Sequence, residues 1–327
     1  MMSKVEKTLI LQSSPHLRDR ESVPRIMYTV VLALVPPIAA SLYFFRLRAA
    51  VLLFSCVLAS LTTEALFLWL RKKPFFFILD GSAIITGLLL AMTLPPSIPL
   101  DIAVLGAFVA ISLGKQVFGG LGYNIFNPAL VGRAFLQSAF PVAMTTWIPP
   151  VTLKVDTATF ATPLGNLKFQ HALSLGTLTP LKELFWGNIG GCLGETSAFA
   201  ILLGASYLIY RRTIDWRIPL GIITSLFIFT GALWIASPFK FAPPLFHLFA
   251  GGLLIGAFFM ATDMVTSPLH KTGIWIYSVG IGLIISLIRL FGGFPEGVMY
   301  SILFMNAFVP LLNRFTRPRI LGERRRK

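Results

Sequence analysis

IMYTVVLALVPPIAASLYFF spans residues 26–45, and AAVLLFSCVLASLTTEALFLWL follows at residues 49–70 after an interval of only three residues. An α-helix needs about 20 apolar residues to cross a hydrocarbon core of roughly 30 Å. Both stretches reach that length, and the only acidic residue in either of them is Glu64. Each stretch therefore predicts a transmembrane helix.

The composition of the whole chain agrees with a membrane protein. Of 327 residues, 55% are hydrophobic and 13% are charged, and the mean hydropathy is +0.78. So few polar side chains cannot cover a water-soluble globule of this size. The two cysteines, Cys56 and Cys192, lie in apolar stretches without a second Cys or a His at metal-ligand spacing. We therefore expect neither a disulfide nor a metal site.

Eight further apolar runs predict an all-α, polytopic protein with about ten transmembrane helices. One of them, 82–96, is short, because it begins after Asp80-Gly81 and ends at Pro95-Pro96. We expect it to cover part of the bilayer or to be completed by irregular backbone buried in protein. The seven longer runs are residues 100–118, 127–146, 185–210, 216–236, 245–262, 274–291 and 296–313.

The charged residues predict the orientation. A net charge of +15 would suggest nucleic acid in a soluble protein, but membrane proteins place Lys and Arg at cytoplasmic helix ends, so no nucleic-acid partner is expected. With both termini in the cytoplasm, 20 Lys and Arg lie inside and 6 outside. The polar start is not a signal peptide. We expect a cytoplasmic tail at residues 1–25, one transmembrane domain at 26–313 and a basic cytoplasmic tail at 314–327. The transmembrane domain includes a large outer loop at 147–184.

Two pairs of similar segments indicate an internal repeat. Residues 87–96, GLLLAMTLPP, resemble 256–268, GAFFMATDMVTSP, and the Phe-Gly-Gly at 118–120 recurs at 291–293. The members of each pair lie five predicted spans apart. Because five is odd, the two halves have opposite orientations in the membrane. This predicts inverted five-helix repeats, a plan that places binding sites near the repeat interface and at interrupted helices.

The outer loop contains a short motif that has two interpretations. A loop rich in Asp and Thr is typical of turns and hydroxyl caps. The pattern Asp-x-x-Ser/Thr-x-Ala-Thr is also similar to the sequence recognised by flavin transferases, which join the phosphate of FMN to the last Thr hydroxyl. Here its positions are Asp156, Thr159, Ala161 and Thr162, and Phe160 stands where Gly is usual.

Several motifs occur along the chain in a fixed order: SSPH at 13–16 with RIM at 25–27, GGLGYNIFNPA at 119–129, FPVAMTTW at 140–147, TDMVT at 262–266 and FGGFPEG at 291–297. By these motifs the chain resembles the RnfD/NqrB family over nearly its whole length, and RnfD more closely. The resemblance implies a membrane subunit of an Rnf-type ferredoxin:NAD⁺ oxidoreductase, with FMN on Thr162, a second flavin, riboflavin, and electron transfer coupled to ion pumping. It also implies other members of the complex, a flavin transferase and membrane lipid as partners, in the cell membrane of a bacterium or archaeon.

Asn124 and Asn127 lie in the glycine-rich motif before a predicted span. Asn127 is placed to cap the helix that Pro128 begins. Amide groups set in an apolar wall also suit the polar edge of a flavin. By the family resemblance, both asparagines are assigned to riboflavin, and the two roles are compatible.

Ionisable groups at membrane depth are functional candidates. Glu195, with Thr196, is assigned to the FMN end of the electron path, and Glu64 and Asp263 to ion coupling. Each acid has an alternative role as a structural partner of Arg133 or Arg289, which also fall within spans. Asp263 has possible oxygen ligands for a hard cation nearby, at Thr262, Thr266 and Ser267.

Two other functional classes fit parts of the sequence. A cofactor-free secondary transporter would also have inverted repeats, a broken helix and intramembrane acids. A purely structural scaffold of the complex would keep the fold but would not need the Thr162 motif. We favour the electron-transfer flavoprotein, in which the cofactor carries the electron, so no side chain is expected to be catalytic.

Overall fold

The computed structural model describes residues 22–151, 161–170, 173 and 176–318. Every regular element in these ranges is helical, which confirms the all-α prediction. In chain order the elements are α1 (Val23–Phe45), α2 (Leu47–Leu70), η1 (Phe75–Asp80), α3 (Ser82–Met92), α4 (Leu100–Ile111), η2 (Ser112–Gln116), α5 (Pro128–Ala139), α6 (Pro141–Thr145), α7 (Pro163–Phe169), α8 (Leu181–Trp186), η3 (Leu193–Glu195), α9 (Ala198–Tyr210), α10 (Arg217–Ala236), α11 (Pro244–Phe249), α12 (Leu253–Ile255), η4 (Gly256–Met260), α13 (Lys271–Phe291) and α14 (Val298–Phe315).

Five of these helices, α1, α2, α10, α13 and α14, are long and apolar enough to cross a membrane. Two more, α3 and α9, are apolar but shorter. Large apolar side chains also face outward, as at Ile228 and Ile235 of α10, which are 70% and 76% exposed. Such side chains are stable in contact with lipid and costly in contact with water. The chain is therefore a multi-pass membrane protein.

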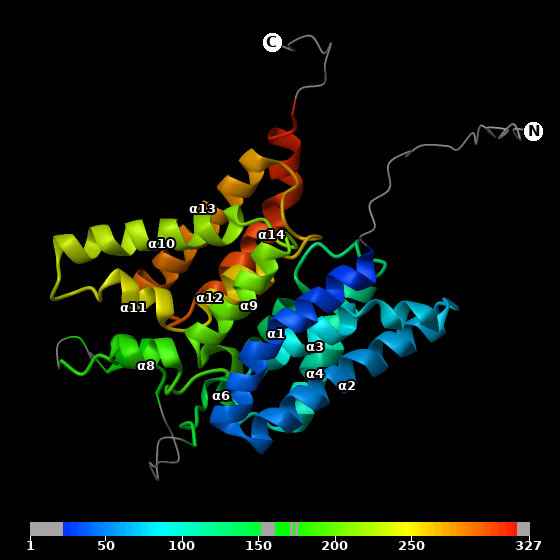
Figure 1. Ribbon diagram of the computed structural model, residues 1–327, viewed down its shortest axis with the longest axis horizontal. Helices are drawn as coiled ribbons and strands as arrows, with labels where there is room; N and C mark the ends of the chain where they lie inside the picture. Colours follow the sequence, from blue (N-terminus) through cyan, green and yellow to red (C-terminus); the bar gives the residue numbers. More distant parts are fainter. Residues whose placement is uncertain (1–21, 152–160, 171–172, 174–175, 319–327) are drawn as a thin grey trace, which may run out of the picture.

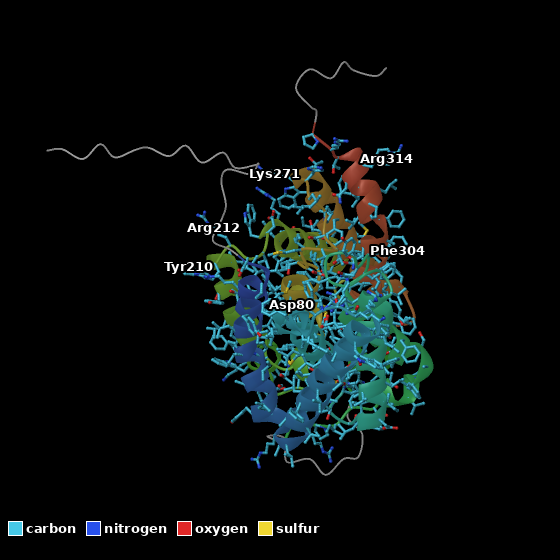
Figure 2. The ribbon with its side chains drawn as sticks, turned by 90° about the vertical axis from the view of Figure 1, so that its right-hand side faces the viewer. Asp80, Tyr210, Arg212, Lys271, Phe304 and Arg314 are labelled. Atoms are coloured by element: carbon cyan, nitrogen blue, oxygen red, sulfur yellow. The ribbon has the colours of Figure 1, made fainter. Side chains whose placement is uncertain are left out.

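The helices form two groups that meet along α1 and α9 (Figure 1). Helices α1 to α4 lie together at the lower right of the view, and α10 to α14 lie at the upper left. Within the first group α4 packs on α2 and α5, and within the second α13 packs on α10 and α14. The groups also touch where α5 meets α14. Toward one end of the molecule lie three basic side chains from the second group and its margin: Arg212, Lys271 and Arg314 (Figure 2).

The short predicted span 82–96 ends in buried irregular backbone, as expected. Its helix, α3, stops at Met92, and Thr93 and Leu94 continue without helical structure while almost fully buried. The Leu94 carbonyl accepts a hydrogen bond from the Leu193 backbone N–H at 3.2 Å. Non-helical backbone is tolerated at membrane depth when protein groups satisfy it in this way.

Hydropathy predicted single helices where the backbone in fact breaks. Before Pro141, Phe140 leaves the helical region at φ −131° and ψ 56°, as expected for a residue that precedes proline. Gly187 and Gly251 adopt φ values of +109° and +71°, which end a right-handed helix. An average over apolar residues does not detect such local conformations. The predictions of one continuous helix are wrong for the spans 127–146, 185–210 and 245–262.

Candidate functional site

Thr162 is the N-cap of α7 and lines a large cavity. Its Oγ1 accepts a hydrogen bond from the Gly165 backbone N–H at 3.1 Å, which confirms the capping interpretation of this motif. Ala161 and Thr162 line a cavity of about 570 Å³, here named the Thr162 cavity. Asp156 and Thr159, the recognition positions of the motif, lie outside the described residues. The other walls are apolar or aromatic with a few polar groups: Met144, Trp147, Phe169, Phe294, Tyr300, Arg133, Gln137, Gln170 and Glu296.

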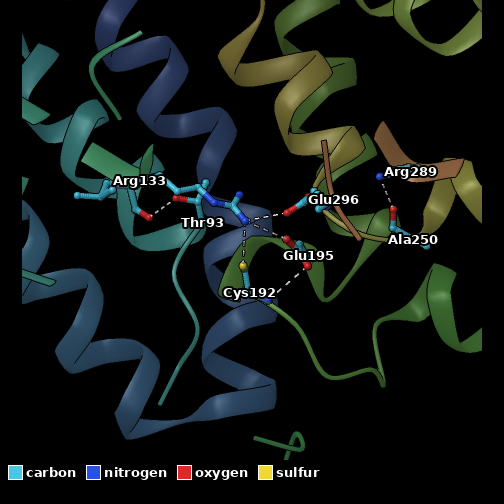
Figure 3. Close-up of polar contacts among 9 residues, drawn as sticks. Thr93, Arg133, Cys192, Glu195, Ala250, Arg289 and Glu296 are labelled. Carbon is cyan, nitrogen blue, oxygen red and sulfur yellow. Dashed lines mark hydrogen bonds and ion pairs between the residues drawn. The ribbon is translucent and has the colours of Figure 1, made fainter. Parts of the chain in front are cut away.

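Arg133 and Glu296, which line the Thr162 cavity, belong to a buried charge cluster with Glu195. Figure 3 shows the contacts of this cluster. The Arg133 guanidinium on α5 donates to Glu296 Oε2 at 2.7 Å, and the same nitrogen lies 4.0 Å from Glu195 Oε1. Glu296 Oε1 accepts from the Gly252 backbone N–H at 2.6 Å. Glu296 thus joins the first helix group, through Arg133, to the second. Charge-assisted bonds of this kind are the strong ones in a dry interior.

Glu195 and Thr196 are both buried, and neither of them lines the Thr162 cavity. Their assignment to the FMN end of the electron path stays a prediction. Thr196 Oγ1 donates to the Leu193 carbonyl at 3.2 Å. Glu195 Oε1 lies 4.0 Å from the Arg133 guanidinium, so Glu195 is a partner of Arg133, the alternative role given above for this acid.

Sequence reasoning missed Glu296 as a site residue. The acid stands in the motif FGGFPEG, but its partner Arg133 lies 163 positions away in the chain. No local pattern connects residues so far apart. The available signal was that Arg133 lies within one predicted span and Glu296 at the start of another, since buried charges need partners.

Asn124, Asn127 and Asp263 come together around a second cavity, here named the Asn124 cavity. Asn127 Oδ1 accepts from the backbone N–H groups of Ala129 and Leu130, at 3.1 and 3.3 Å, so the predicted helix cap is confirmed. Asn127 Nδ2 donates to the Met260 carbonyl at 3.2 Å. Most of the Asn127 amide is thus engaged by protein.

Asp263 is held by its own turn. Its two carboxylate oxygens accept from the Val265 backbone N–H at 3.3 Å and from Thr266 Oγ1 at 3.2 Å. Asn124, which lines the same cavity, donates from Nδ2 to the Phe126 carbonyl at 3.2 Å. Thr262 Oγ1 instead donates to the Phe258 carbonyl at 2.7 Å. Of the predicted oxygen ligands, Thr266 is therefore bonded to Asp263 and Thr262 is turned away.

Glu64 has a partner that the sequence did not predict. Lys115 donates to Glu64 Oε1 and, at 2.5 Å, to Ser82 Oγ, and Gln116 Nε2 donates to Glu64 Oε1 at 3.2 Å. Glu64 therefore pairs with Lys115 and not with Arg133 or Arg289, the alternative given above, and Lys115, counted among the inner cations, is buried. Lys115 is 2% exposed, because it lies in the π-helix η2 that continues α4 within the helix bundle.

Known proteins of similar sequence identify the family. A family model described as the NQR2, RnfD, RnfE family matches residues 10–322. The chain is 46% identical to the D subunit of the proton-translocating ferredoxin:NAD(+) oxidoreductase complex of Clostridium ljungdahlii, over 99% of each chain. It is 46% identical to the Na(+)-translocating counterpart of Acetobacterium woodii over 97% of this chain and 96% of that one. It is 42% identical to the D subunit of the ion-translocating oxidoreductase complex of Stutzerimonas stutzeri, over 94% of each. The chain belongs to the NQR2, RnfD, RnfE family.

Proposed function

We propose that this chain is the D-type membrane subunit of an Rnf-type ion-translocating ferredoxin:NAD⁺ oxidoreductase, and that it transfers electrons through bound flavins. Two relatives with this name match it at 46% identity over nearly their whole lengths. Its other partners would be the remaining subunits of the complex, a flavin transferase that loads it, and membrane lipid. The two relatives are named for different ions, protons and Na⁺, so the coupling ion is a separate question.

FMN would be joined to Thr162 by a phosphoester, and this proposal rests on one observation: the Thr162 side chain lines a cavity of ligand size. The cavity of about 570 Å³ falls in the range of roughly 300–1,000 Å³ that small-molecule sites occupy. Trp147, Phe169 and Phe294 give it apolar walls, and Arg133 and Gln137 offer donors to a carbonyl edge. When bound, FMN supplies the electron-transfer chemistry. The Arg133–Glu296 ion pair would set the electrostatic environment of the flavin ring in this cavity.

Riboflavin would bind at the Asn124 cavity. The lining supplies amide, hydroxyl and carboxylate groups in an apolar wall, which suits the polar edge of a flavin. The cavity itself measures only about 90 Å³, less than the usual range. Its apolar side chains, such as Met27, Leu121 and Met264, would have to move apart when the flavin binds. Asn124 and Asp263 would then carry most of the polar contacts, because Asn127 already caps α5.

The membrane domain would cross the bilayer about ten times as two inverted five-helix repeats, with both termini in the cytoplasm. The packing of α2 on α4 and of α4 on α5 has a counterpart in the packing of α10 on α13 and of α13 on α14. The contacts α1 with α9 and α5 with α14 pair corresponding helices, as a two-fold relation requires. The gathering of basic side chains toward one end agrees with a cytoplasmic face there.

Ion coupling is assigned to Asp263 and Glu64. Asp263 lies on the Asn124 cavity, and the Lys115 partner of Glu64 lines the same cavity. A change in the charge of a flavin there would alter the field at both acids. The proposed ion-coupling groups would then lie beside the flavin proposed for the Asn124 cavity.

The test compares Thr162→Ala with Thr145→Ala in the purified complex. Thr145 lines the same cavity but lies outside the attachment motif, so it is a matched control. We expect Thr162→Ala to abolish the in-gel flavin fluorescence of the denatured chain, Thr145→Ala to leave it unchanged and Thr159→Ala to reduce it. A colourless wild-type chain would instead favour the cofactor-free transporter. Full fluorescence in Thr162→Ala would move the attachment point elsewhere.

A further inference from the structure

A third cavity lies on the other side of α7, and the ionisable side chains that line it are all basic. Thr162, Gly165 and Phe169 face the Thr162 cavity, whereas Leu164 and Lys168 line a separate cavity of about 420 Å³. We name it the Lys240 cavity. None of the described residues that line it is acidic. Its basic members come from four segments of the chain: Lys168, Lys240, His247 and Arg289.

Two of these basic side chains are buried and have nitrogen atoms that make no hydrogen bond. His247 is fully buried, and neither of its ring nitrogens has a hydrogen-bond partner. Arg289 is 5% exposed; its terminal nitrogens donate to the carbonyls of His247 and, at 3.0 Å, of Ala250, but Nε has no partner. Each unsatisfied buried group costs about 1–3 kcal/mol or more. These atoms are closed to solvent here, so Arg289 and His247 would have to turn toward the cavity, where an anion with several acceptor oxygens would satisfy both of them.

Lys168 lies on α7, the helix that Thr162 caps, and lines this cavity. Its ammonium group donates to the carbonyls of Ile288 and Arg289, both at 3.2 Å, and of Phe294 at 2.8 Å. Burial lowers the pKa of the Lys168 amine, so a nearby anion would favour its charged form. An anion in the Lys240 cavity would therefore strengthen the attachment of α7 to the end of α13.

We propose that the Lys240 cavity binds the phosphate group of an anionic membrane phospholipid. The surface around it suits lipid: Phe239 is 96% exposed, and Phe291, at the end of α13, is 63% exposed. The adjoining faces of α10 and α13, which pack together, expose Ile235 and Leu287 at 76% and 47%. Acyl chains would lie along these faces while aromatic and basic side chains hold the headgroup.

The phosphate of a covalent FMN does not explain the cavity. That phosphate would be bonded directly to Thr162 Oγ1, and Thr162 lines the other cavity. The lipid site is independent of whether flavin is attached. Free inorganic phosphate has the same binding chemistry as a lipid headgroup, so the experiment must separate these two sources.

The test places a photoreactive benzoylphenylalanine at Phe239 in the whole complex. The exposed position tolerates the larger ring. The complex is reconstituted in nanodiscs of equal parts phosphatidylglycerol and phosphatidylcholine, illuminated and digested, and the lipid adducts of the labelled peptide are quantified by mass spectrometry. We expect phosphatidylglycerol adducts to exceed phosphatidylcholine adducts about tenfold, which corresponds to about 1.4 kcal/mol. Millimolar inorganic phosphate should not reduce that preference.

Lys240→Gln and Lys182→Gln complete the test. Lys182, on α8, is another exposed lysine but does not line the cavity. Lys240→Gln should reduce the preference several-fold, and Lys182→Gln should leave it unchanged. Equal labelling of the two lipids in the unsubstituted protein, or crosslinking to another protein of the complex in place of lipid, would overturn the proposal. Loss of the preference on adding inorganic phosphate would assign the site to the free ion and also overturn it.

Discussion

Replacing Glu296 by Ala tests the buried cluster that joins the two helix groups. The change removes a carboxylate that accepts from Arg133 at 2.7 Å and from the Gly252 backbone N–H at 2.6 Å. Removing one partner of a buried ion pair costs about 3–5 kcal/mol, because the remaining charge stays buried. Glu195 already lies 4.0 Å from the same guanidinium and has a free oxygen, so it can compensate in part. We expect Glu296→Ala to lower the free energy of unfolding by about 3 kcal/mol.

Glu296→Gln separates charge from shape. A Gln amide has one acceptor oxygen, so it can accept from Gly252 or from Arg133 but not from both, and its NH2 group then faces the other donor. A hydrogen bond to a charged group contributes about 1.5–3 kcal/mol. We therefore expect the Gln variant to lose about 1.5–3 kcal/mol of unfolding free energy, less than the Ala variant loses at the same site. Glu195→Gln should lower the free energy of unfolding more in the Glu296→Ala variant than in the unsubstituted protein, because Arg133 then has neither carboxylate.

The assay is unfolding of the purified chain by SDS titration, followed by circular dichroism. Glu183→Ala is the matched control, since Glu183 is an exposed acid on α8. It should change the free energy of unfolding by less than about 0.5 kcal/mol. Equal stability of Glu296→Ala and Glu183→Ala would disprove this role of Glu296, since it would mean that the Arg133 pair adds nothing to the contact between the groups.

The remaining charged groups and the topology can be tested separately. Asp263→Asn should impair ion transport while the in-gel flavin fluorescence is kept; normal ion uptake with full redox turnover would remove Asp263 from the coupling mechanism. Lys115→Met should destabilise the chain by about 3–5 kcal/mol, and adding Glu64→Gln should restore part of that loss, because no buried charge is then left unpaired; additive losses in the SDS assay would contradict this. Alkaline phosphatase fused within 150–180 should be active and a C-terminal fusion inactive, and the reverse pattern would invert the proposed topology.

Long uninterrupted helices are the part of the fold that the sequence predicts best. The ends of α10 and α13 agree with the apolar runs 216–236 and 274–291 within three residues. The mean hydropathy of a whole span is enough to locate such helices. The breaks at Gly187 and Gly251 cannot be predicted in this way. They depend on single backbone conformations with positive φ, which leave hydropathy unchanged.

Local motifs predict helix caps better than they predict partners. Asn127 caps α5 as the Asn-Pro pattern indicates, and Thr162 caps α7 as a loop rich in Asp and Thr indicates. The pairing of Arg133 with Glu296 joins segments far apart in the chain. So does the pairing of Lys115 with Glu64, which no local pattern indicates. Tertiary packing, not local sequence, decides such pairs.

Whether Thr162 carries a flavin can be decided from the mass of one peptide. Trypsin cleavage after Lys154 and Lys168 releases residues 155–168, which contain Thr157, Thr159 and Thr162. With FMN esterified to Thr162, this peptide from the native complex is heavier by the mass of FMN less one water, and fragmentation places the addition on Thr162. An unmodified peptide, or an addition on Thr157 or Thr159, would contradict the proposed attachment.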